Sequence, residues 1–273
     1  RTVFNLNISD ATYEYIGGAV GYATNTALSS ISVGHYSYEN NYRRIVFNIN
    51  LDNCDSNNYF GGIAGNMVAS QLSSSDAITE INVSGSEANT ESTTNYINAF
   101  AGLIGRYSLA GSSSYLNINN SNTSANINYL DSTITNLYTS SGVAYIESGN
   151  GAEIVIRQSL FTGTITSELD SESGSSSINA NLINVHAGGV AAYAQGCTLV
   201  LEEVMSTTDI ILGSLQSTIQ TYLGGLVGEV STANNNGGIV QATNVASTGR
   251  IIPITSYNTD ATRNLFYIGG FVG

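Results

Sequence analysis

Apolar and polar residues alternate in short stretches along the whole chain. In residues 4–8 phenylalanine, leucine and isoleucine alternate with asparagine, and residues 45–51 repeat the pattern with similar residues. A period of two places every apolar side chain on one face of a β-strand. No stretch shows a helical period, and the longest Ser/Asn/Gly segments, residues 111–126 and 170–181, are typical of loops. The pattern therefore predicts an all-β protein built from short strands.

A glycine motif recurs between these stretches. Seven times a pair of small residues is followed by apolar residues and usually another glycine, as in Gly61-Gly62-Ile63-Ala64-Gly65. The second residue of each pair stands at 18, 62, 102, 142, 189, 225 and 270, so the steps are 44, 40, 40, 47, 36 and 45 residues. Such a recurrence indicates one supersecondary unit stacked repeatedly. The pairs contain Gly17, Gly18, Gly61, Gly62, Gly102, Gly142, Gly188, Gly189, Gly224, Gly225, Gly269 and Gly270.

The repeat predicts a parallel β-helix, that is, a solenoid. Each unit contains about three strand-like stretches: one that starts with the glycine motif, one after a Ser/Asn/Gly turn, and one before the next motif. Glycine pairs suit the corners of such a coil, where the backbone turns or approaches its neighbour closely. We therefore expect residues 1–273 to form a single solenoid of about seven repeats, as part of a longer array or assembly.

A seven-bladed β-propeller is the alternative architecture, because seven repeats of this length also fit seven blades. Kelch-type blades even use a glycine pair. In those blades, however, the apolar run precedes the pair and a tryptophan usually follows. Here the apolar residues follow the pair and tryptophan is absent, which favours the β-helix.

Composition narrows the range of functions. The formal charge is −13, charged residues make up only 10% of the chain, and all seven basic residues are arginine. Nucleic-acid binding needs basic patches, and an anionic membrane surface would repel this chain. No apolar run approaches the roughly 18 residues of a membrane-spanning helix. The Ser/Thr/Asn-rich, lysine-free surface is typical of extracellular β-rich proteins, so we expect an extracellular or cell-surface location.

The motifs GGAVG, GGIAG, AGLIG, GGLVG and GGFVG resemble those of GLUG-motif repeat proteins, whose repeats read Gly-Gly-Leu-Val-Gly followed by a turn and a strand. That family includes bacterial surface adhesins and large secreted proteins of microbial eukaryotes. The resemblance covers the whole chain, although the repeats here are longer than usual, and the motifs at 141–145 and 188–192 lack the last glycine. It implies a repetitive surface protein and supplies no catalytic residues.

Four Asn-x-Ser/Thr sequons mark candidate glycosylation sites: Asn7, Asn82, Asn119 and Asn122. Asn7, Asn82 and Asn119 alternate with apolar neighbours. If those neighbours point inward, the asparagines point to solvent, where an N-glycan can be attached. We therefore expect covalent N-glycans if the source is a eukaryotic secretory pathway.

Two cysteines, Cys54 and Cys197, are too few for a disulfide framework. They lie on opposite sides of their glycine motifs, so stacking would separate them by more than a disulfide spans. We expect Cys197, ahead of Leu199 and Leu201, to be a buried small apolar residue and Cys54 to be a loop thiol. An intermolecular bridge at Cys54 is the alternative.

Catalytic and metal-binding constellations are missing from the sequence. The two histidines, His35 and His186, have no obvious second ligand nearby, and the acidic residues are dispersed, with Glu202-Glu203 among the closest clusters. Nucleophile and phosphate-loop motifs are also absent. We therefore expect no enzymatic activity, no cofactor and no metal site, with calcium at an acidic cluster as a minor alternative.

Tyrosines gather around the glycine motifs. Half-buried tyrosine ladders beside a glycine corner would stabilise the stack, whereas an exposed aromatic strip would bind sugars or another subunit.

Together these features predict a secreted structural protein whose solenoid subunits assemble with copies of themselves into an extracellular filament or surface appendage. The argument is that the sequence shows no evident cap at either end of the repeat, and open β-helix ends invite further strands. The alternative is an adhesin or a carbohydrate- or protein-binding stalk excised from a longer surface protein. Neither hypothesis involves nucleic acid or membrane insertion.

Overall fold

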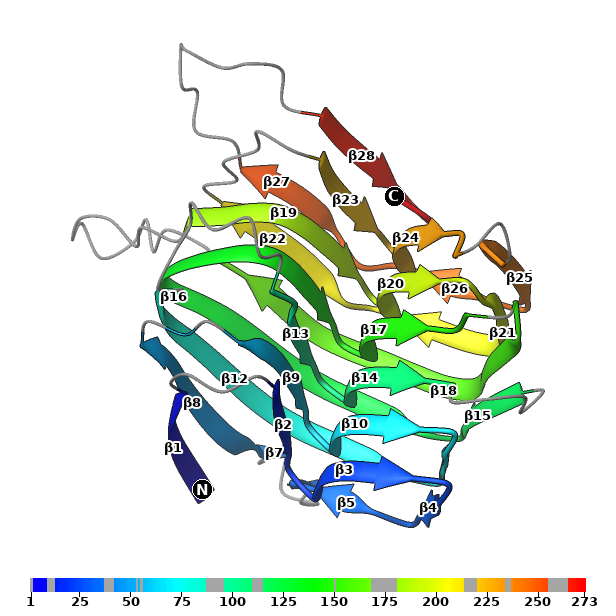
Figure 1. Ribbon diagram of the computed structural model, residues 1–273, viewed down its shortest axis with the longest axis horizontal. Coiled ribbons are helices and arrows are strands. Elements are labelled where there is room, and N and C mark those ends of the chain that lie inside the picture. The colour runs from blue at the N-terminus through cyan, green and yellow to red at the C-terminus, as the bar shows by residue number, and fades with distance from the viewer. Residues whose placement is uncertain are drawn as a thin grey trace.

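The computed structural model describes residues 2–8, 13–36, 42–52, 54, 56–86, 96–109, 115–149, 151–167, 181–213, 220–233, 237–254 and 265–273. Within these ranges every regular element is a β-strand, which confirms the all-β prediction. No helix capable of spanning a membrane occurs in them. Strands from successive repeats pair side by side and in parallel, and the sheets they form curl around a common interior (Figure 1).

The strands fall into five rows, which we number along the repeat. Row one carries the outward-facing asparagines and contains β1 (Thr2–Ile8), β8 (Ile45–Asp52), the later part of β12 (Asp76–Ser86), the middle of β16 (Asn122–Ser140), the end of β18 (Glu153–Thr166), β22 (Asp209–Gly213) and β27 (Ile251–Ile254).

Rows two and three lie before and after the glycine motif. Row two contains β2 (Tyr13–Gly17), β9 (Asn57–Gly61), β13 (Asn98–Ala101), the end of β16, β19 (Asn181–Gly188), β23 (Gln220–Gly224) and β28 (Leu265–Gly269). Row three contains β3 (Val20–Thr24), β10 (Ala64–Val68), β14 (Ile104–Ser108), β17 (Val143–Glu147), β20 (Ala191–Gln195) and β24 (Val227–Ser231).

Rows four and five are shorter and complete the repeat. Row four contains β4 (Ala27–Ser29), β11 (Gln71–Ser73), β15 (Tyr115–Asn119), the start of β18, the start of β21 (Thr198–Ser206) and β25 (Ile239–Thr243). Row five contains β5 (Ser32–Val33), the starts of β12 and β16, the middle of β18, the end of β21 and β26 (Ala246–Ser247). A short antiparallel pair, β6 (His35–Tyr36) and β7 (Tyr42–Arg43), lies outside the rows.

The sequence pattern predicted three strands per repeat, and the described chain forms more. Row-five pairings extend over as few as two residues, Asp76 and Ala77 opposite Ser32 and Val33. Two residues are too few to show a period-two alternation, so this row has no signal of its own in the sequence.

The prediction of a loop over residues 111–126 is wrong for residues 115–119 and 122–126, which form β15 and the start of β16. The other predicted loop, residues 170–181, lies outside the described residues except for Asn181, where β19 begins.

The apolar core follows the predicted alternation. In row one, five buried residues lie in register on successive strands: Phe47, Ile81, Ile127, Ile165 and Ile210. They pack with the row-two residue Phe60 in one apolar cluster, while the inward residues of rows three and four form a second. Apolar columns that stack in parallel therefore bury side chains from successive repeats in two clusters inside the curled sheets.

The glycine motif forms the bend between rows two and three. At Gly62 an added Cβ atom would lie 2.0 Å from the carbonyl oxygen of Gly102 in the next repeat. At Gly18 the corresponding distance, to the Gly62 oxygen, is 2.2 Å. Such contacts are far shorter than packed atoms allow, so these bends need glycine because neighbouring repeats approach each other there.

The fourth glycine motif, residues 141–145, pairs with the third motif in a register that differs by one residue from the register that the sequence predicted. Val143 pairs with Ile104, and the nitrogen of Leu103 donates to the oxygen of Gly142. Gly142 therefore takes the place of Leu103, and Ser141 takes the place of Gly102. The sequence analysis matched Gly142 with Gly102 because both are glycines. This match is wrong by one residue, because the pairing of β17 with β14 puts Ser141 opposite Gly102.

A second type of turn follows row four. Six residues in register there adopt positive φ angles of about 50°: Ser30, Ser74, Asn120, Gln158, Glu203 and Asn244. In three of these turns the next position is a serine: Ser75, Ser121 or Ser159. Each serine Oγ accepts from a backbone nitrogen of the adjacent turn in the preceding repeat, and each hydroxyl donates to the carbonyl oxygen two residues earlier in its own turn. These serines satisfy backbone groups that a turn leaves without strand partners.

Row one carries an asparagine ladder, which we define as Asn5, Asn48, Asn82 and Asn128. Each amide nitrogen donates to the side-chain oxygen of the preceding asparagine, over 2.8, 2.9 and 2.8 Å. Asn5 is exposed and the other three are half-buried. The ladder thus links four successive repeats on the outer face of row one.

Candidate functional site

The most distinctive side-chain arrangement lies along the bend between rows two and three. On row two, the residues in register are Tyr15, Tyr59, Ala99, Tyr138, His186, Tyr222 and Tyr267. On row three they are Tyr22, Asn66, Arg106, Tyr145, Tyr193 and Glu229. We call these two facing columns the aromatic seam.

Small residues allow the two columns to meet. The fifth motif position is glycine in most repeats, and a Cβ atom at Gly105 would lie 2.7 Å from the nitrogen of Phe60 in row two. In the two repeats that lack this glycine, the position holds alanine, Ala144 and Ala192, and both are fully buried. Rows two and three therefore pack backbone against backbone at this bend, which brings their outward tyrosines together.

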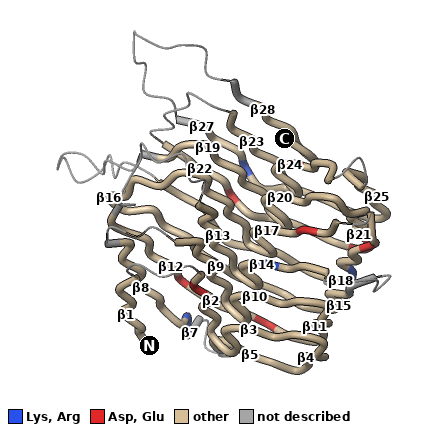
Figure 2. The backbone as a smooth tube through the Cα atoms, in the orientation of Figure 1, with Lys and Arg blue, Asp and Glu red and all other residues tan. Residues whose placement is uncertain are grey.

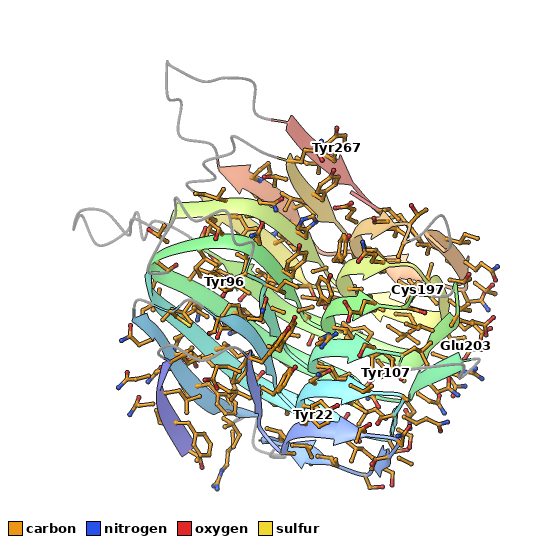
Figure 3. All side chains as sticks on the ribbon, viewed as in Figure 1. Tyr22, Tyr96, Tyr107, Cys197, Glu203 and Tyr267 are labelled. Atoms are coloured by element: carbon orange, nitrogen blue, oxygen red, sulfur yellow. The ribbon has the colours of Figure 1, made fainter. Side chains whose placement is uncertain are left out.

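Ring contacts run along the seam from one end to the other. Tyr15 stacks on Tyr59 with centroids 5.6 Å apart, and Tyr222 stacks on Tyr267 at 4.8 Å. Edge contacts cross between the columns, including Tyr138 with Tyr145 at 5.0 Å. Figure 3 shows Tyr22 and Tyr267 near opposite ends of the stack. Aromatic pairs in these geometries stabilise beyond the area they bury.

The middle of the seam is closed, and only its ends are exposed. Tyr59 is 3% exposed and Tyr145 is 7% exposed, whereas Tyr22 is 51% and Tyr267 is 41% exposed. Burial raises the pKa of Tyr59, Tyr138 and Tyr145 well above the ordinary value for tyrosine. The central tyrosines are therefore packing residues, and no open aromatic strip for a ligand exists there.

Polar side chains replace tyrosine at four places in the seam: Asn66, Arg106, His186 and Glu229. Arg106 pairs with Glu147 and lies over the ring of Tyr59, 5.4 Å from its centroid. His186 is sandwiched between Tyr138 and Tyr222, and its Nδ1 atom lies 2.9 Å from a Glu229 carboxylate oxygen. Arg106 and His186 therefore each have a carboxylate partner inside an aromatic environment.

The sequence did not identify these pairs. His186 has a carboxylate partner from the following repeat, 43 positions away, and Arg106 has one 41 positions away. A search for oppositely charged residues about forty positions apart in the sequence could have found both pairs. His35, the other histidine, lies in β6, apart from His186.

The four sequon asparagines occupy different environments. Asn7 is exposed in β1. Asn82 belongs to the asparagine ladder through both of its amide atoms, and Asn122 donates to Asp76 and accepts from the nitrogen of Leu160. Asn119 is half-buried, and its side-chain oxygen has no hydrogen-bond partner. Glycosylation at each of them stays a prediction, with Asn7 the most accessible acceptor.

Both cysteines are free and buried. Burial raises the pKa of the Cys197 thiol to about 12, as expected for an apolar site. Cys54 lies outside the strands as predicted, but it is only 1% exposed, and its sulfur lies 2.8 Å from the Ser56 hydroxyl. This burial argues against the intermolecular bridge considered for Cys54.

A shallow side pocket lies on the outer face of rows four and five, away from the seam. It encloses about 280 Å³ and is lined by Asn119, Arg157, Gln158, Glu202, Glu203, Thr243 and Asn244. Elsewhere in the described part of the chain, charged residues are sparse and scattered along the backbone (Figure 2). Among the residues that the structure describes, no group of three or more histidine, cysteine or acidic side chains is arranged to hold a metal ion.

No protein-family model, curated protein or solved structure matches this chain.

Proposed function

We propose that the five rows form a parallel β-helix and that this solenoid serves as an extracellular structural element that assembles end to end into a filament or surface appendage. The pairings between repeats support the architecture, because those of all five rows are parallel and join equivalent strands. Blades of a β-propeller are antiparallel sheets. A fold in which most side chains pack between successive repeats suits a structural role.

The observation that carries the assembly is the pair of open sheet edges. Within the described residues, β1 pairs only with β8, and β28 pairs only with β23. Apolar side chains are exposed on these strands, such as Phe4 at 44% and Ile268 at 50%. Unpaired backbone groups next to exposed apolar side chains favour the addition of further strands.

Assembly is tested with the purified chain by light scattering over a range of concentrations and by negative-stain electron microscopy. We expect rods that lengthen with concentration. Phe4→Lys or Ile268→Lys should shorten them, because a charge at an open edge opposes pairing. Leu160→Lys, at a 40% exposed position in the middle of the stack, is the matched control and should leave assembly unchanged.

Monomers at all concentrations, or equal effects of all three substitutions, would exclude filament formation through these edges.

The alternative function, an adhesin or binding stalk, is favoured by Pro253. This residue is the single proline of the chain and lies in β27, which pairs only with β22 among the described strands. Because Ile210 donates to the oxygen of Arg250, residues 250, 252 and 254 face β22 and Pro253 faces the open edge. A proline at an edge blocks strand addition. Pro253→Val should increase self-association if this residue limits stacking.

A further inference from the structure

The side pocket differs from the rest of the repeat surface in its side chains. Its walls come from two columns: the last residues of row four, which are Asn119, Arg157, Glu202 and Thr243, and the turn residues that follow them, including Gln158 and Glu203. In the first two repeats the same positions hold only serines, Ser29 and Ser73 followed by Ser30 and Ser74. Longer polar side chains therefore enclose a space that the repeat by itself does not create. Figure 3 shows Glu203 at the right-hand edge of the molecule, away from Tyr267 near the top.

The pocket offers both hydrogen-bond donors and acceptors that are only partly used. The side-chain oxygen of Asn119 and the Nε atom of Arg157 are buried and make no hydrogen bond. Arg157 Nε lies 3.9 Å from Glu202, and Gln158 donates to Glu203 over 3.2 Å. Buried polar atoms without partners are uncommon in folded proteins, so the hydrogen bonding of this wall is incomplete within the chain itself.

The charges of the pocket restrict what such a molecule can be. Arg157 opposes a metal cation, and Glu202 and Glu203 oppose an anion. A hydroxyl group both donates and accepts, so it fits a wall where amide, guanidinium and carboxylate groups alternate. The volume of about 280 Å³ lies just below the range of pockets for drug-sized ligands and suits one or two sugar rings.

We propose that the side pocket binds a neutral saccharide through Asn119, Arg157 and Glu202. The pocket has no aromatic wall, so binding rests on hydrogen bonds and should be weak, with a dissociation constant in the millimolar range. This site lies apart from the aromatic seam and from the open edges, so it adds a binding activity to the structural role.

The test is ligand-observed saturation-transfer NMR on the complete chain with the methyl glycosides of glucose, galactose, mannose and N-acetylglucosamine. At least one glycoside should show saturation transfer that reaches a plateau at millimolar concentrations. Arg157→Gln and Glu202→Gln should each weaken its binding by about fivefold or more, because each removes one charged partner at a partly exposed position. Circular dichroism of both variants should match that of the parent chain.

Gln71→Ala is the matched control, because Gln71 lines a second shallow pocket, with Asn25, Thr26, Ala27 and Ala69, that contains no charged side chain. It should bind the glycoside as the parent does. The proposal is overturned if no glycoside binds, if Gln71→Ala weakens binding as much as Glu202→Gln, or if calcium or inorganic phosphate binds at the pocket more tightly than every glycoside. None of these results bears on filament formation, which light scattering reports separately.

Discussion

The aromatic seam and the asparagine ladder are both columns of identical or similar side chains stacked across successive repeats, but they differ in solvent exposure. Tyr59 and Tyr145 of the seam are buried, at 3% and 7% exposed, whereas the asparagines of the ladder are half-buried or exposed. The seam removes large apolar surface from water, and the ladder exchanges water for side-chain hydrogen bonds. Although both columns stack across successive repeats, we therefore expect the seam to stabilise the fold more than the ladder does.

The seam depends on the glycine bend, because small residues are what bring rows two and three together. Gly62→Val should have the largest effect, since a Cβ atom there would lie 2.0 Å from the Gly102 oxygen. We expect a loss of about 4 kcal/mol or more, enough to leave the chain unfolded. Circular dichroism and urea unfolding measure it. Gly149→Ala is the control, because nothing lies within 4 Å of its added Cβ, and a folded Gly62→Val would contradict the close approach.

Removal of a buried ring from the seam should have the next largest effect. Tyr59→Ala should lower the free energy of unfolding by about 3–5 kcal/mol, as for other large buried aromatic residues. Tyr22→Ala, at a 51% exposed position of the same seam, should cost less than about 1 kcal/mol. Similar losses for the two variants in urea unfolding would show that burial does not determine the contribution of the seam.

Alkaline pH should weaken the seam and leave the ladder unaffected. Burial raises the pKa of Tyr59, so the unfolded chain loses this proton first, and stability falls as pH rises above about 10. Tyr59→Phe cannot ionise, so at pH 11 it should lose about 1.4 kcal/mol less stability, relative to pH 8, than the parent chain. Urea unfolding at the two pH values measures this difference. If both proteins lost the same stability between pH 8 and pH 11, groups other than Tyr59 would cause the loss.

A break in the ladder should have the smallest effect. Asn82→Ala removes one hydrogen bond to Asn48 and one from Asn128, and we expect a loss of about 1 kcal/mol because both are partly exposed to water. Asn7→Ala, an exposed sequon asparagine outside the ladder, should change stability by less than about 0.5 kcal/mol. If Asn82→Ala lowered the free energy of unfolding as much as Tyr59→Ala, the seam would not stabilise the fold more than the ladder does.

Sequence reasoning succeeded where one residue type recurs with a simple physical cause. Period-two alternation identified the buried residues of row one, such as Phe47 and Ile81, and the glycine pairs marked the bend. It failed where a contact depends on register between repeats. The spacing of the glycine motifs placed the fourth bend one residue too late, at Gly142 instead of Ser141. The side pocket joins residues from four repeats, from Asn119 to Thr243. Such sites follow from strand pairing, which loops of different length obscure.

The same reason explains the pairs inside the seam. Nothing local distinguishes Glu229 from other surface acids, and its position against His186 arises only when β24 stacks on β20 after the bend. The burial of Cys54 was missed because a residue outside the strands shows no alternation.

The central claim is an open, parallel stack of repeats, and distances between spin labels on its turns test it most directly. Ser30, Ser74, Asn120, Gln158, Glu203 and Asn244 occupy equivalent turns of six successive repeats. Cysteines for labelling would replace Ser30 together with Gln158, Glu203 or Asn244 in turn, with Cys54 and Cys197 changed to alanine. In a parallel stack the separation should grow by about 4.8 Å per repeat, so the pair at 30 and 244 is the farthest apart. A shorter separation for 30 and 244 than for 30 and 158, as in a closed ring of blades, would contradict the stack.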